Sequence, residues 1–231
     1  MTTTAARPLP RGTDRRHERR RQTIEEIVDV AVAVMRENGA AGLSLGEVAR
    51  RVGIRTPSLY VYFASKNALY DAVFARGWQQ LLDTMDAARA ELGQPTDLTD
   101  YLTTAAETIV RWAVDNATSA QLMFWRPVPD YEPAPDAYAP AVRMLERSRE
   151  SFLQVEAAGL FRPGVDVDEA LRTWTVLTSG VFTQQMANAP HEPFETGRFT
   201  TAIPRVVEMY VAVYGRPATP ARGGRSHADQ R

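Results

Sequence analysis

Two short helical patterns joined by a three-residue turn constrain the fold of this 231-residue chain more than any other feature. Residues 44–47, Ser-Leu-Gly-Glu, have the form of a capping box that begins a helix, and Gly53 ends its apolar pattern. Thr56 and Pro57 begin the next helix, with threonine as the expected cap and proline at the first helical position. This arrangement is typical of a helix-turn-helix, whose second helix presents its N-terminal residues to the major groove of DNA.

Apolar residues at three- and four-residue spacing predict helices along most of the remaining chain. They are expected at residues 23–39, 65–92, 98–112, 142–158, 168–188 and 199–214, with a short apolar piece at 122–125. Residues 127–140 contain five prolines and are expected to form a loop. Because no segment shows a strand pattern, the predicted class is all-α.

The charge is distributed unevenly along the chain. Residues 1–66 carry 12 basic and 7 acidic side chains, a net charge of +5, whereas the remainder carries −6. Seven arginines fall within the first 21 residues. This balance indicates that the N-terminal part meets a polyanion, although an arginine-rich terminus is also common in solvated, disordered tails.

Residues 53–69, GIRTPSLYVYFASKNAL, closely resemble the recognition-helix signature of the TetR family of transcriptional regulators. Leu43-Ser44-Leu45 and Val48-Ala49 precede them in the order and spacing of that family, so the resemblance covers roughly residues 20–70. Tyr62 stands where family members commonly carry histidine, and Arg55 where a small capping residue is usual. The resemblance implies a sequence-specific DNA-binding regulator, usually a repressor, with operator DNA as its partner.

A recognition helix packs one side on the preceding helix and presents the other side to DNA. Leu59 and Phe63 are expected on the packing side, whereas the resemblance makes Tyr60 and Lys66, the only lysine of the chain, phosphate contacts. The predicted DNA-binding residues are Ser44, Gly46, Arg55, Thr56, Pro57, Ser58, Tyr60, Tyr62 and Lys66. For single positions the alternative to DNA contact is a structural role. Tyr60 would then be a half-buried core tyrosine, Lys66 a solvated charge, and Ser44 a helix cap.

For the remainder of the chain the resemblance implies a helical domain that binds a small effector and forms a homodimer. Its aromatic and methionine side chains suit an apolar or aromatic effector, although a packed core is the commoner explanation of such residues. The candidate effector-binding residues are Trp112, Phe124, Phe152, Trp174 and Thr178. The candidate dimer contacts are Val181, Gln184, Gln185, Asn188, Val206, Val207, Tyr210 and Val213. For the valines an intramolecular core is the alternative.

The expected domains are therefore a flexible basic arm (residues 1–21), a three-helix DNA-binding domain (22–68), a larger helical effector-binding and dimerisation domain (69–215), and a disordered tail (216–231). A helix-turn-helix protein controlled by a protein partner, or without an effector, remains an alternative.

Enzyme activity is not expected, since the three histidines are scattered and no catalytic, phosphate-loop or metal-ligand motif is present. Neither a metal nor a cofactor is predicted. Cysteine is absent, and the sequence shows neither a signal-peptide pattern nor an apolar run of membrane-spanning length. A cytoplasmic location, without membrane association, is the expectation.

Overall fold

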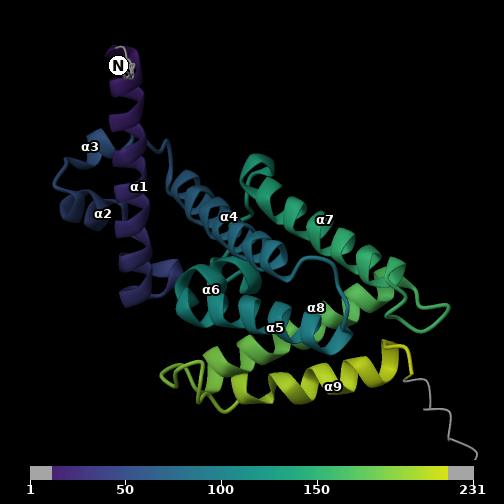
Figure 1. Cartoon of the computed structure of the whole chain (residues 1–231). Coiled ribbons are helices and arrows are strands. Elements are labelled where there is room, and N and C mark those ends of the chain that lie inside the picture. The colour runs from purple at the N-terminus through teal and green to yellow at the C-terminus, as the bar shows by residue number, and fades with distance from the viewer. Residues whose placement is uncertain (1–11, 218–231) are drawn as a thin grey trace, which may run out of the picture. The chain divides into compact units, whose positions relative to one another are not determined.

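The structure, a computed structural model, describes residues 12–217, with side chains from Arg15 onward. Within this range the chain is helical (Figure 1), and an isolated antiparallel bridge joins Phe161 to Gly215. The α-helices are α1 (Gly12–Asn38), α2 (Leu45–Val52), α3 (Thr56–Leu59), α4 (Lys66–Leu92), α5 (Leu98–Asp115), α6 (Ala117–Trp125), α7 (Pro135–Ala157), α8 (Val167–Asn188) and α9 (Ile203–Tyr214). Two 3₁₀ turns, η1 (Ala40–Gly42) and η2 (Thr200–Ala202), precede α2 and α9. The predicted all-α class is confirmed for the described residues.

The chain divides into two compact units. Unit 1 comprises the described residues up to Thr84 together with Trp112–Leu145. Unit 2 comprises Met85–Arg111 together with the described residues from Glu146 onward. Helices α4, α5 and α7 each contribute residues to both units. This division by packing differs from the boundary expected after residue 68, so the assignment of functions to residues 22–68 and 69–215 stays a prediction.

In unit 1, α2 packs against both α1 and α3 (Figure 1). The turn between α2 and α3 depends on Gly53, which has a φ of 81°, a value that glycine adopts without the steric cost of a side chain. Its N–H and that of Ile54 satisfy the last carbonyls of α2. Beyond the turn, Leu59 and Phe63 are buried, as predicted.

Two contacts attach the start of α4 to the elements before it in unit 1. The buried Tyr70 hydroxyl donates a hydrogen bond of 2.7 Å to the carbonyl oxygen of Ala40, in η1. Arg76 Nη1 lies 2.6 Å from Asp29 Oδ1, on α1. The helix that follows the helix-turn-helix is thus fixed to α1 and to the turn before α2.

In unit 2, α8 and α9 pack side by side (Figure 1). The Tyr210 hydroxyl donates to the carbonyl oxygen of Ala170 at 2.8 Å, and its ring meets the edge of Trp174 with centroids 5.1 Å apart. Four of the candidate dimer contacts, Val181, Gln185, Val207 and Tyr210, are buried inside this chain. These four side chains are therefore not available as surface contacts, and for Val181 and Val207 the expected alternative, an intramolecular core, holds.

Several predicted helix starts differ from the observed ones, among them those of α1 and α3. Helix α1 begins at Gly12, so residues 12–21 are helical rather than a flexible arm, and Arg21 pairs with Glu18 one turn earlier at 2.7 Å. Helix α3 has Arg55, not Thr56, as its N-cap. Residues 1–11 lie outside the described chain.

The loop expected at residues 127–140 is shorter, because α7 begins at Pro135. The N–H of Ala134 donates to Asp71 Oδ1 at 3.1 Å, and the carbonyl oxygen of Ala134 accepts from Tyr138 N. Proline is tolerated at the first helical position, where its missing N–H would have no helical partner. Arg216, expected to lie in a disordered tail, is held instead, since its N–H donates to the carbonyl oxygen of Leu160 at 2.8 Å. Residues 218–231 lie outside the described chain.

A buried amide on α8 organises the segment that leads to α9. Gln185 is 1% exposed; its Nε2 donates to the carbonyl oxygen of Ala189 at 2.7 Å, and its Oε1 accepts from Phe199 N at 3.1 Å. The substitution Gln185→Met keeps the volume but removes both bonds. We expect it to lower the free energy of unfolding by about 2–3 kcal/mol, since two backbone groups lose their partner.

Urea unfolding measures this change, and Gln184→Met provides the matched control. Gln184 is the exposed neighbour on the same helix, so its substitution should leave the free energy of unfolding nearly unchanged. Equal losses from the two variants would show that the buried amide has no special role.

Candidate functional site

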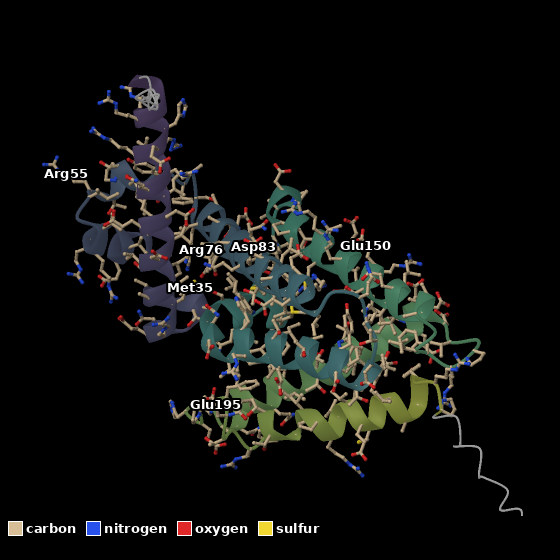
Figure 2. All side chains as sticks on the ribbon, viewed as in Figure 1. Met35, Arg55, Arg76, Asp83, Glu150 and Glu195 are labelled. Atoms are coloured by element: carbon tan, nitrogen blue, oxygen red, sulfur yellow. The ribbon has the colours of Figure 1, made fainter. Side chains whose placement is uncertain are left out.

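The outward side of α3 and its adjoining turns carries most of the predicted DNA-binding residues. Pro57, Ser58 and Tyr60 are exposed, with half of the Tyr60 side-chain surface accessible, and Thr56 is half-buried. Figure 2 shows Arg55, the N-cap of α3, pointing away from the ribbon. Hydroxyls, an aromatic ring and a guanidinium therefore meet water on one short surface.

Lys66 lies at the first residue of α4 and is positioned by two contacts. Its ammonium donates to the carbonyl oxygen of Ala41 at 3.2 Å and lies 5.5 Å from the centroid of the Tyr70 ring. One of its three N–H donors is thereby used, and the side chain remains half-exposed. Near this positive group, the Oγ of Ser65 accepts from Ala68 N and caps the helix. An ammonium beside a helix N-terminus is a suitable site for a phosphate.

Ser44 caps α2, since its Oγ accepts from Glu47 N at 3.4 Å. The glutamate does not complete the capping box, because its carboxylate contacts Arg50 and Arg51 instead. Gly46 is exposed, and a Cβ at this position would lie no closer than 3.9 Å to another atom. The backbone around Gly46 therefore does not require glycine, whereas Ser44 has a structural role as a cap.

Two arginines of α2 are neutralised within the fold. Arg51 Nη2 lies 2.6 Å from Glu37 Oε2 on α1, and its Nε lies 2.6 Å from Glu47 Oε1. Hydrogen bonds from Arg50 and then Arg51 lower the pKa of Glu47 to about 2, and the bond from Arg51 also lowers the pKa of Glu37. These four side chains join α1 to α2 and offer little net charge to DNA.

Exposed arginines instead lie on the N-terminal part of α1. Arg16, Arg19, Arg20 and Thr23, at helical spacing, line an open groove of about 330 Å³ with Val61 and Tyr62. The Arg20 guanidinium lies 5.3 Å from the centroid of the Tyr62 ring, a cation–π arrangement. Tyr62 thus faces the arginines of α1.

Sequence reasoning placed these arginines in a flexible arm and missed their fixed position beside Tyr62. The spacing of three and four residues from Arg16 to Thr23 was a signal for a helical face. It went unused because this stretch has no apolar residues.

The five candidate effector residues are divided between the two units. Trp112 and Phe124 belong to unit 1, where the Phe124 ring meets Trp78 with centroids 5.1 Å apart. Phe152 and Trp174, in unit 2, line a cavity of about 40 Å³. Thr178 donates its hydroxyl to the carbonyl oxygen of Trp174, within its own helix.

The cavity is small for a ligand site, since pockets for drug-sized ligands have volumes of roughly 300–1,000 Å³. Sequence reasoning missed its other walls, which come mostly from α4 and α5. They are Met85, Ala88, Arg89, Leu92, Tyr101, Leu102, Ala105, Ser148 and Ser151.

Metal ligation has no support among residues 12–217. In this range no three histidine, aspartate or glutamate side chains gather in a way that would hold a metal ion. The helices described here include none with the length and apolar character needed to cross a membrane.

Residues 27–73 match the family model described as bacterial regulatory proteins, tetR family. The chain is 30% identical over 146 residues to the HTH-type transcriptional regulator Rv1816 of Mycobacterium tuberculosis, a match that covers 63% of this chain and 61% of the relative. It is also 30% identical over 122 residues to the tetracycline repressor protein class D of Escherichia coli, covering 41% and 55% respectively. The chain thus spans less than two thirds of the length of either relative.

Among solved structures, the TetR family transcriptional regulator PfmR of Thermus thermophilus has a similar fold. Its TM-score is 0.62 at 19% identity, with 83% of this chain and 99% of that chain covered. The match of residues 27–73 falls on α1, α2, α3 and the start of α4, the elements that build the exposed surface around Arg55 and Lys66. Residues 27–73 are thus similar to the helix-turn-helix segment of the tetR family of bacterial regulatory proteins.

Proposed function

We propose that the protein is a sequence-specific DNA-binding transcriptional regulator, a repressor that leaves its operator when a small effector binds. The observation that carries the proposal is the two-sided α3 segment, which buries Leu59 and Phe63 and exposes Arg55, Ser58 and Tyr60. Such a helix can enter a major groove while its packing against the core stays intact. A regulator of this kind acts in the cytoplasm, where its DNA lies, and needs no catalytic group.

Within this proposal the exposed residues have separate roles. Arg55, Thr56, Pro57, Ser58 and Tyr62 contact bases or the backbone beside them, with Ser44 and Gly46 at the edge of the interface. Tyr60 and Lys66 contact phosphates. The arginines of the α1 groove, Arg16, Arg19 and Arg20, extend the phosphate contacts along the duplex, because a positive helical face suits a polyanion.

As is usual in the family, the effector is proposed to bind in the helical region that follows the DNA-binding segment. The effector would favour dimers whose two recognition helices do not fit successive major grooves, which lie roughly 34–36 Å apart. The proposed alternative is control by a protein partner. It is supported by the exposed Tyr138, Val142 and Leu145, which lie at helical spacing on α7.

The homodimer is proposed to form through exposed side chains of α8 and α9. Val176 on α8, with Met209 and Val213 one turn apart on α9, are each more than half exposed. Val206, Gln184 and Asn188 also remain at least partly accessible. A two-fold dimer doubles the short half-site that one recognition helix reads.

The phosphate contacts predict a change in the salt dependence of DNA binding. Lys66→Ala and Arg19→Ala should each weaken binding to operator and random duplexes alike, because phosphate contacts carry little sequence information. The slope of log affinity against log salt should flatten by about 0.9 for each phosphate that is no longer neutralised. Fluorescence anisotropy across a salt series measures both quantities.

Arg205→Ala, on α9, is the charge-matched control and should leave the slope unchanged. If Lys66→Ala keeps the original slope, or loses affinity only at the operator, its assignment as a phosphate contact is wrong.

The dimer prediction is that Met209→Lys weakens self-association at least tenfold, because two like charges would face each other across a two-fold axis. Sedimentation velocity over a concentration series measures the dissociation constant. Val142→Lys on α7 places the same charge on another exposed apolar site and should leave association unchanged. An unaltered dimer in Met209→Lys would exclude this face.

Effector control predicts reciprocal coupling. A compound that releases the protein from its operator must bind less tightly when operator DNA is present, by the same factor, and such coupling is typically worth about 1–3 kcal/mol. Dissociation constants measured by titration with and without operator test this directly. Equal constants for every compound that binds would reject effector control and leave the DNA-binding assignment intact.

A further inference from the structure

One face of α1 changes its chemistry toward the N-terminal end of the helix. Ile27, Ala31 and Val34 are fully buried and mark the face of α1 that packs inside unit 1. Two helical turns before Ile27 the same face reaches Arg20, with the half-buried Thr23 between them. The stripe that supplies core side chains farther along the helix therefore offers a guanidinium at residue 20.

Arg20 contacts the aromatic ring of Tyr62. Its guanidinium carbon lies 5.3 Å from the centroid of that ring, within the roughly 6 Å range of cation–π attraction. The ring and the exposed Val61 line the groove of about 330 Å³ together with Arg16 and Arg19. Arg20 thus joins α1 to the turn that follows α3.

An acidic partner does not compete for this guanidinium. Glu18, the acidic residue nearest to Arg20 in the sequence, is paired with Arg21 at 2.7 Å, and among the described side chains no carboxylate pairs with Arg20. A guanidinium that faces a ring keeps the N–H donors at its planar edge. Arg20 can therefore hold the ring with its face and still donate to a phosphate with its edge.

Tyr62 is fixed at its backbone, whereas its hydroxyl is available. Its N–H donates to the carbonyl oxygen of Leu59 at 2.9 Å, and the next residue, Phe63, is buried, so the main chain of this turn has a set position. Within the part of the chain that the structure describes, the Tyr62 hydroxyl forms no hydrogen bond with another protein group. The contact with Arg20 is therefore the polar interaction that sets the direction of the ring.

We propose that Arg20 is a positioning residue for DNA sequence recognition, which holds the Tyr62 ring so that its hydroxyl meets a base edge. This inference rests on the proposed DNA-binding function. It assigns to Arg20 a role that Arg16 and Arg19 do not share, since only Arg20 has a cation–π contact with Tyr62 among the described residues. A phosphate contact carries little sequence information, whereas a hydroxyl held in one direction favours the base whose edge matches it.

The strength of the contact limits the expected effect. A cation–π pair at an exposed site corresponds to a factor of roughly two to five in an equilibrium constant. Without Arg20 the ring gains directions in which its hydroxyl misses the base. The discrimination that Tyr62 provides should then fall by about this factor and no more.

Duplexes selected by the wild-type protein from a randomised pool provide the test. Fluorescence anisotropy on the selected duplex and its single-base variants gives a discrimination ratio at each position, and loss of this ratio in Tyr62→Leu identifies the base that Tyr62 reads. At that base, Arg20→Gln should lower the ratio roughly two- to fivefold. Adding Arg20→Gln to Tyr62→Leu should lower it no further, because the ring that Arg20 positions is already absent.

Two further variants separate positioning from charge. Arg19→Gln removes the same charge from the same groove, and it should weaken binding to all duplexes alike and leave the ratio unchanged. Arg20→Lys keeps a cation over the ring and should retain most of the ratio. An unchanged ratio in Arg20→Gln, an equal loss in Arg19→Gln, or additive losses in the double variant would overturn the positioning role.

Nuclear magnetic resonance tests the contact without DNA. The ring current of Tyr62 should shift the side-chain protons of Arg20 upfield, and Tyr62→Phe should keep this shift whereas Tyr62→Leu should abolish it. An Arg20 signal that is the same in all three proteins would overturn the proposal. If the wild-type protein selects no preferred duplex, the proposed function itself fails; a preferred duplex whose ratio survives Arg20→Gln rejects the positioning role alone.

Discussion

Burial of Leu59 and Phe63 determines which residues of this protein can meet DNA. Helix α3 has only four residues, too few to be stable alone in water, so it depends on packing against α2. With Leu59 fully buried, the helical rotation places Ser58 and Tyr60 at the surface. The left-handed Gly53 sets where α3 begins, and the hydrogen bonds of Tyr62 and Phe63 to the carbonyl oxygen of Leu59 continue its turns. The interface is therefore a consequence of the small core beneath it.

Arginine has two different roles in this surface, and ion pairing separates them. Arg51 joins α1 to α2 through Glu37 and Glu47, and the strongly lowered pKa of Glu47 reflects the hydrogen bonds that it accepts from Arg50 and Arg51. Arg16 and Arg19 are exposed and line a groove. A count of basic residues cannot make this distinction, because charges that are paired within the fold attract a polyanion only weakly.

Helix α4 contributes residues to the DNA-binding surface of unit 1 and to the cavity of unit 2. Its first residue is Lys66, beside the recognition segment, and its later turns supply Met85 and Arg89 to the cavity of unit 2. Coupling between two sites requires an element whose equilibrium both ligands bias. Helix α4, which contributes residues to the DNA-binding surface and to unit 2, is a candidate for such an element.

The sequence alone determined the all-α class, the helix-turn-helix and the inward side of α3, because these follow from local periodicity, caps and one glycine. The cap of α8 is equally local, since the carboxylate of Asp166 accepts from Asp168 N and Glu169 N. Tertiary structure decided which of several equivalent apolar positions are buried, as Val207 and Tyr210 are and Val213 is not. It also decided that α7 begins at Pro135, through Asp71 on a distant segment, and that Arg89 borders a cavity. Such contacts depend on how distant helices pack, and a periodic pattern within one helix carries no information about its neighbours.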